Sequence, residues 1–191
     1  MAKSKPRPGG DGKDAAGLYD LLLGRAPSED IEPYEPAALK LAAGIAWEAI
    51  ARHRKGESVV AVESGKVMRE GLPVTVVTVV NDNKPFLFDS VIGEINDSIG
   101  EPLLVSHPVI LARHGRSGIE AILGDGGPSR GNTEADRVSV IHVHVKALSA
   151  AQGEALTGRL LKVLDQVHRA VADWKKMLAR LDQAISQYRY A

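Results

Sequence analysis

The sequence predicts an α+β fold in which helices cover one face of an antiparallel sheet. A run of seven β-branched residues, Val74 to Val80, is typical of a buried strand. The expected elements follow in the order β-β-α-β-β-β-α, with one helix after this strand and one after an antiparallel meander. Apolar residues spaced alternately by four and three between Leu160 and Tyr188 predict a long C-terminal helix.

Composition excludes several classes of function. The 191 residues include 24 basic and 24 acidic ones, so no net charge attracts nucleic acid or an anionic membrane. The absence of cysteine excludes disulfides, thiolate nucleophiles and Cys-ligated zinc, and it is compatible with a reducing cytoplasm. No apolar run reaches the roughly 18 residues that span a bilayer, and the N-terminus lacks a secretory signal. We therefore expect a soluble cytoplasmic protein.

The N-terminal part divides into a tail and a helical segment. Residues 1–16 are rich in Pro, Gly and charge, which predicts a disordered tail. Residues 17–56 predict a short helix ending at Gly24, a brief turn after Pro27 and a longer helix from Pro36 to Gly56. The last turn of that helix carries Arg52, His53, Arg54 and Lys55. We interpret these four residues as compensation of the helix dipole rather than as a binding patch.

Residues 57–172 are expected to form the α+β domain. Ser58–Glu63 is a candidate strand, and a turn at Ser64-Gly65 leads to the strand of Val74–Val80. Three polar residues, Asn81, Asp82 and Asn83, are expected to stop that strand. The apolar spacing then predicts a helix over Pro85–Ile99, with Gly100 as its left-handed cap and with Val91 and Ile95 buried.

The next segments predict a meander. Pro102–Arg113 is a long apolar strand, and a Gly-containing turn makes 119–123 its hairpin partner. Residues 124–133 form a Gly-rich loop that matches no phosphate-binding motif, and we interpret it as a flexible hairpin tip. Arg137–Lys146 is the last strand.

The C-terminal helix is expected to begin after Ser149, which forms a capping-box pattern with Gln152. Residues 173–191 continue this helix beyond the length that a sheet can cover, and we expect the chain end to cut it short. Its distal stripe could pack on the N-terminal helix carrying Trp47, on its own copy in a second chain, or on further parts of a longer protein, and we favour the N-terminal helix. Self-association of the remainder would then give a homo-oligomer.

A candidate binding site lies where the strand Val74–Val80 leads into the next helix. The loop Asn81-Asp82-Asn83 stands beside free backbone N–H groups at the positive end of the helix dipole, which favour an anion such as an amino-acid carboxylate. Asp82 and Asp89 could meet the ammonium group. The alternative interpretation is that the three loop residues only make the turn and cap the helix.

Other chemistry-bearing residues give weaker signals. His142 and His144 lie two residues apart on one face of a strand, where imidazoles can share a metal. Only His107 offers a third ligand, so hydrogen-bonded sheet histidines are the favoured interpretation and no metal site is predicted. Ser90 and Ser106 lack the signature of a catalytic nucleophile. We therefore predict no catalytic residue in this chain.

Four segments resemble the N-terminal region of the very large bacterial NAD-specific glutamate dehydrogenases. Residues 81–91 are similar to that family's N-D-D-x-P-F-L-V-D-S-V signature, with Asn83 and Phe88 as departures within the loop and helix. Residues 106–109 resemble the strand after its first helix, residues 141–145 its I-H-(I/V)-x-(I/V) strand, and residues 171–177 its V-x-D-W-x-x-M helix. The resemblance covers roughly residues 18–188.

This resemblance implies an ACT-like fold, to which the order of elements also comes close. It implies a regulatory or assembly region without turnover, which binds an amino-acid effector at the loop of residues 81–83. NAD would be bound by other parts of the full-length enzyme, and the remainder of that polypeptide would be a partner. Two alternatives are a free-standing ACT-like amino-acid sensor and a protein-interaction module.

Overall fold

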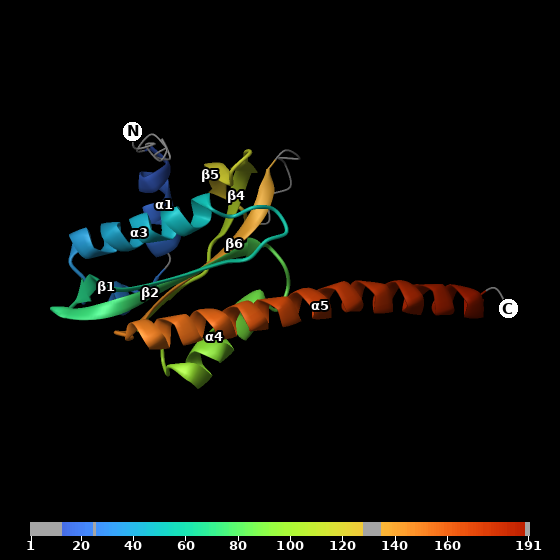
Figure 1. Ribbon diagram of the computed structural model, residues 1–191. Helices are drawn as coiled ribbons and strands as arrows, with labels where there is room; N and C mark the ends of the chain where they lie inside the picture. Colours follow the sequence, from blue (N-terminus) through green and yellow to red (C-terminus); the bar gives the residue numbers. More distant parts are fainter. Residues whose placement is uncertain (1–12, 25, 128–134, 190–191) are drawn as a thin grey trace, which may run out of the picture.

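The computed structural model describes residues 13–24, 26–127 and 135–189. Within this part of the chain, helices lie on both faces of one antiparallel sheet (Figure 1). The strand order is β1-β2-β6-β4-β5, and β3 also pairs with β6. The elements are α1 (Lys13–Leu23), α2 (Ser28–Ile31), α3 (Pro36–Ala51), β1 (Val59–Arg69), β2 (Leu72–Asp82), α4 (Leu87–Ser98), β3 (Leu104–Ser106), β4 (Val109–His114), β5 (Ile119–Asp125), β6 (Asp136–Lys146) and α5 (Ala150–Arg189).

Two central strands, β2 and β6, are buried on both faces. Residues 74–81 of β2 and 138–145 of β6 are all buried, because helices cover the sheet above and below. The β-branched run therefore forms the predicted buried strand. Asn81 and Asp82 do not stop it as predicted, since they still pair with Ser139 and Val138 of β6.

The two faces of the sheet have separate cores. Helices α1 and α3 pack on one face, and α4 and α5 pack together on the other (Figure 1). The predicted pairing of the helix after β2 with the C-terminal helix is thus confirmed. Val91 and Ile95 are fully buried in this second core, as expected from their spacing.

The β1–β2 hairpin differs from the prediction at its turn. The chain does not turn at Ser64-Gly65, where the register shift between Ser64 and Val67 forms a β-bulge. It turns at Glu70-Gly71, and both residues have a positive φ, 50° and 77°. This two-residue turn matches the twist of the strands. As a result, β1 is longer than the predicted strand.

The predicted strand over Pro102–Arg113 is two strands. Both β3 and β4 pair with β6, and residues 107 and 108 separate them. Pro108 has no backbone N–H, so the ladder of hydrogen bonds cannot run through it. The expected hairpin partner is confirmed as β5, which extends to Asp125. Of the predicted Gly-rich loop, residues 128–133 lie outside the described residues.

The N-terminal segment begins and ends differently from the prediction. Helix α1 starts at Lys13, so residues 13–16 belong to a helix and not to the expected tail. Residues 1–12 lie outside the described part. Helix α3 ends at Ala51, and Arg52 is its C-cap. The Nε of Arg52 donates to the carbonyl of Glu48 in the last turn. The basic residues 52–55 therefore follow the helix rather than forming its last turn.

Helix α5 begins at the predicted capping box. The amide of Ser149 donates to Oε1 of Gln152, and the amide of Gln152 donates to Oγ of Ser149. The distal half of the helix does not pack on the N-terminal helix as predicted, because α3 lies on the opposite face of the sheet. No helix among the described residues has an apolar stretch long enough to cross a membrane.

Candidate functional site

The predicted binding loop lies at the junction of β2 and α4. Asn81 and Asp82 are the last two residues of β2, and Asn83 follows with its amide bonded to the carbonyl of Arg137. Helix α4 then starts at Leu87. Its N-cap, Phe86, has a left-handed backbone with φ of 68° and an exposed ring.

The side chain of Asn81, on β2, forms hydrogen bonds with residues at the start of β1 and on α5. Its side chain is buried, and Nδ2 donates to Oγ of Ser58 at 2.6 Å at the start of β1. Its Oδ1 accepts a hydrogen bond from Nε2 of His168 on α5 at 3.1 Å. The side-chain amide of Asn81 is therefore hydrogen-bonded within the domain at both its nitrogen and its oxygen.

Asp82 starts a chain of polar groups that the sequence did not reveal. Its Oδ2 accepts the amide N–H of Gly56, and its Oδ1 lies 3.7 Å from Nε2 of His53. His53 Nδ1 and His114 Nε2 are 3.1 Å apart, and His114 Nδ1 lies 2.9 Å from Oδ2 of Asp136. The four side chains come from distant parts of the sequence. We refer to them as the Asp82–Asp136 relay.

The Asp82–Asp136 relay joins the end of α3 to three strand ends. Burial lowers the pKa of His53, although the carboxylate of Asp82 opposes this shift. A hydrogen bond from Lys55 lowers the pKa of Asp136. His53 is completely buried and its Nε2 has no hydrogen-bond partner, so Asp82 is the nearest group of opposite charge available to it when it is protonated. The relay thus fixes Asp82 in a structural role.

The other two predicted residues remain accessible. Asn83 and Asp89 are both exposed, and Asp89 lies in the first turn of α4. The N-cap of this helix is Phe86, which makes no side-chain hydrogen bond, so the loop residues 81–83 do not cap α4. Backbone N–H groups at such a helix end attract a carboxylate, and Asp89 provides a negative charge beside them.

The predicted histidine pair lies in the core beneath the N-terminal helices. Nε2 of His142 and Nε2 of His144 are 3.0 Å apart, and both side chains are completely buried. The remaining nitrogens meet hydroxyls, with Thr78 Oγ1 at 3.1 Å from His142 Nδ1 and Tyr34 Oη at 3.0 Å from His144 Nδ1. All four ring nitrogens therefore have partners within the protein.

These contacts favour neutral, hydrogen-bonded imidazoles. Burial lowers the pKa of His142 to about 4 and holds the pKa of His144 well below its usual value. His107 is not part of this cluster, because its ring stacks on Phe88 and its Nε2 bonds to Ser139. Within the described residues, no three side chains of His, Asp or Glu are arranged to hold a metal.

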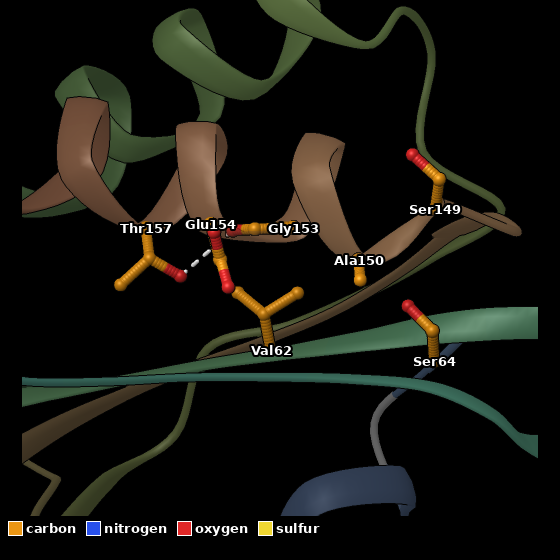
Figure 2. Close-up of a pocket in the computed structure, with 7 residues that line it drawn as sticks. All are labelled: Val62, Ser64, Ser149, Ala150, Gly153, Glu154 and Thr157. Atoms are coloured by element: carbon orange, nitrogen blue, oxygen red, sulfur yellow. Dashed lines mark hydrogen bonds between the residues drawn. The ribbon is translucent and has the colours of Figure 1, made fainter.

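A groove of about 480 Å³ lies between β1 and the first turns of α5 (Figure 2). Its polar groups are largely engaged: Ser64 Oγ bonds to Thr75 Oγ1, and Thr157 Oγ1 donates to the carbonyl of Gly153. The capping box occupies the N-terminus of α5 beside it. These polar groups of the groove therefore already have partners within the protein.

An antiparallel sheet with α4 and α5 paired on one face defines an ACT-like α+β domain. A family model described as "Glutamate dehydrogenase, ACT1 domain" matches residues 18–160. The chain belongs to this family, and the matched region includes the junction of β2 and α4. Comparisons with curated proteins and with solved structures gave no match.

Proposed function

We propose that this chain is a non-catalytic regulatory domain of an NAD-specific glutamate dehydrogenase, and that it binds an amino-acid effector at the junction of β2 and α4. The family assignment supports the link to glutamate dehydrogenase. The Gly-rich segment 124–133 lacks the G-x-G-x-x-G pattern of dinucleotide sites and precedes a strand, so it does not fit NAD. In this proposal, NAD binds to another part of the enzyme.

The observation that carries the effector site is that α4 combines an uncapped N-terminus with an exposed carboxylate in its first turn, directly after the central strand β2. Helix α3 also lacks a side-chain cap, but it has no acidic residue in its first turn. The first turn of α5 is closed by the reciprocal bonds of Ser149 and Gln152. The N-cap of α4 has no such bond, and its first turn includes the exposed carboxylate of Asp89. An amino acid presents a carboxylate and an ammonium group, which match the helix amides and Asp89 respectively.

Asp82 has a different part in this proposal from the one that the sequence suggested. It holds Gly56 and faces His53, so it positions the end of β2 rather than the ligand. Asp89 makes the ligand contact. Substituting each aspartate in turn can therefore distinguish the structural role of Asp82 from the ligand contact of Asp89.

A thermal-shift screen with the common L-amino acids tests the site. A ligand at a hundred times its dissociation constant stabilises the folded state by about 2.7 kcal/mol, which raises the melting temperature by several degrees. Asp89→Ala should abolish this rise and leave the melting temperature without ligand unchanged, since Asp89 is exposed. Asp82→Ala should lower the melting temperature without ligand. A parent protein that responds to no amino acid would refute the effector site.

The regulatory assignment has its own test. The isolated chain should not reduce NAD in the presence of glutamate, whereas turnover would show that it carries catalytic residues. A free-standing amino-acid sensor is the alternative. An amino acid that binds this domain but leaves the activity of the complete enzyme unchanged would favour that alternative.

A further inference from the structure

The hydrogen bonds of the Asp82–Asp136 relay fix the tautomer of each neutral histidine. A carboxylate only accepts hydrogen bonds, so His114 must carry a proton on Nδ1, which lies 2.9 Å from Oδ2 of Asp136. The Nε2 atom of a neutral His114 is then an acceptor. It lies 3.1 Å from Nδ1 of His53, which must therefore be the donor of that hydrogen bond.

One nitrogen of the neutral relay is left without a hydrogen bond. With its proton on Nδ1, a neutral His53 directs the lone pair of Nε2 towards Oδ1 of Asp82, which lies 3.7 Å away. Two acceptors that face each other repel, and this nitrogen is buried and has no hydrogen-bond partner. Moving the proton of His53 from Nδ1 to Nε2 does not remove the conflict, because Nδ1 would then face the acceptor Nε2 of His114. The neutral relay therefore lacks one proton.

We propose that the Asp82–Asp136 relay is a binding site for a single additional proton, and that uptake of this proton fixes the end of β2 against the turn that follows α3. With one proton added, His53 donates from Nε2 to Asp82, and His114 donates from Nδ1 to Asp136. The third proton of the two rings lies in the hydrogen bond between them. A second added proton is excluded, because two N–H groups would then face each other at 3.1 Å.

The charged groups around the two rings favour one added proton. Among the described residues, these groups are Asp82 at the end of β2, Asp136 at the start of β6, Glu57 before β1 and Lys55 after α3. Towards α5, Asp82 also faces His168, whose Nε2 bonds to Asn81. Lys55 Nζ lies 2.5 Å from Oδ1 of Asp136 and offsets that carboxylate, so the added proton offsets the charge of Asp82.

Burial determines the pH range in which the proton is bound. It lowers the pKa of His53 below the ordinary value of 6.5, although the carboxylates of Asp82 and Glu57 oppose this shift. Uptake is therefore expected in acidic solution. His53 itself is completely buried, whereas the side chains of Asp82 and His114 are 25% and 14% exposed, so the proton reaches the rings from either end of the relay.

The added proton acts on the junction of β2 and α4 through Asp82. Oδ2 of Asp82 already accepts the amide N–H of Gly56 at 3.0 Å. When Oδ1 accepts from His53 as well, both oxygens hold the end of β2 against the turn after α3. Asn83, the next residue, begins the loop to α4. The relay thus makes the position of this junction sensitive to pH.

Long-range proton–nitrogen spectra of the imidazole rings, recorded from about pH 8 to about pH 4 without added amino acid, test the proposal. At the basic end, His53 and His114 should both carry a proton on Nδ1 and none on Nε2. On acidification the two rings should change together and take up one proton between them, and the amide signal of Gly56 should move with the same midpoint. A His53 ring that carries its proton on Nε2 at the basic end, or two rings that each take up a proton in separate steps, would overturn the proposal.

Asp82→Asn tests the role of the facing carboxylate. An asparagine has nearly the same shape, but its Nδ2 can donate to Nε2 of the neutral His53 while its Oδ1 accepts from Gly56. The variant should therefore lower the midpoint of proton uptake by about one pH unit or more. Asp97→Asn is the matched control, because Asp97 is exposed on α4, which packs on the opposite face of the sheet from α3.

The control should keep the midpoint of the parent, and the amide spectra should show that both variants are folded. An Asp82→Asn variant with the parent's midpoint would show that Asp82 does not receive the added proton's hydrogen bond, and the proposal would be wrong. The titration of the parent remains a test if Asp82→Asn does not fold. No amino acid is present in these experiments, so this proposal and the effector site can fail separately.

Discussion

His142 and His144 are buried in the core as neutral imidazoles, so the stability of the domain depends on pH. Burial lowers the pKa of His142 to about 4 in the folded state, whereas the ordinary value is 6.5. Below pH 6.5 the unfolded chain therefore binds a proton that the folded chain does not bind. The stabilising contribution is complete above pH 6.5 and is lost as the pH falls towards 4.

We predict that the titration of His142 alone lowers the free energy of unfolding by about 3 kcal/mol between pH 7 and pH 4. Urea unfolding at several pH values measures the loss. His142→Gln cannot titrate, so its unfolding free energy should fall less steeply over this range than that of the parent. His168→Gln is the control: burial lowers the pKa of His168 as well, but its side chain is only half-buried, so the change in slope should be smaller than for His142→Gln. Equal slopes for His142→Gln and the parent would contradict the assignment of a buried, neutral imidazole.

Gly118 allows the β4–β5 hairpin to contact the end of α3. It has φ of 143°, and a Cβ atom there would lie 2.0 Å from the carbonyl oxygen of Ala51. Gly118→Ala should therefore destabilise the domain by roughly 1 to 3 kcal/mol, measured by urea unfolding. Gly158→Ala is the matched control, since nothing lies within 4 Å of its Cβ position. In the α5 helix that change should stabilise the domain by up to about 1 kcal/mol. A Gly118→Ala variant as stable as the parent would contradict the close contact with Ala51.

At the scale of elements, the interface of α4 with the sheet and α5 is the clearest stability determinant. Ile95 is fully buried there. Ile95→Ala should lower the unfolding free energy by about 2 to 5 kcal/mol, because it removes apolar contacts and leaves a cavity. Ile185→Ala removes the same groups from an exposed position on α5 and should cost under about 0.5 kcal/mol in the monomer. If Ile95→Ala lowered the free energy of unfolding by less than about 0.5 kcal/mol, the buried face of α4 would have to lie elsewhere.

The elements that sequence predicted well are those with strong periodicity. The apolar spacing of α4 and the capping box of α5 identified both helices, because each is a local property of the chain. The turn at Glu70-Gly71 was missed, since Glu in a left-handed conformation gives no composition signal. The sequence also did not show which face α3 covers, because that depends on pairing with the whole sheet.

At the scale of the whole molecule, the candidate site was only partly predictable. The junction of β2 and α4 was expected, as was Asp89 as a candidate contact, but the helix begins at Leu87 rather than Pro85, and this places Asp89 in its first turn. The roles of Asn81 and Asp82 were not, because their partners His168 and His53 lie far away in the sequence. No local pattern joins His53, His114 and Asp136, so the relay could be found only in three dimensions.

At this scale, the proposed effector site at the first turn of α4 can be tested directly. The most direct measurement is a titration of the isotopically labelled domain with the amino acid that gives the largest thermal shift, followed by two-dimensional amide NMR. The largest changes should fall on the amides of residues 83–90, and Asp89→Ala should remove them. Changes confined to the groove beside β1, around Ser64 and Gly153, or no changes at millimolar amino acid, would contradict this claim.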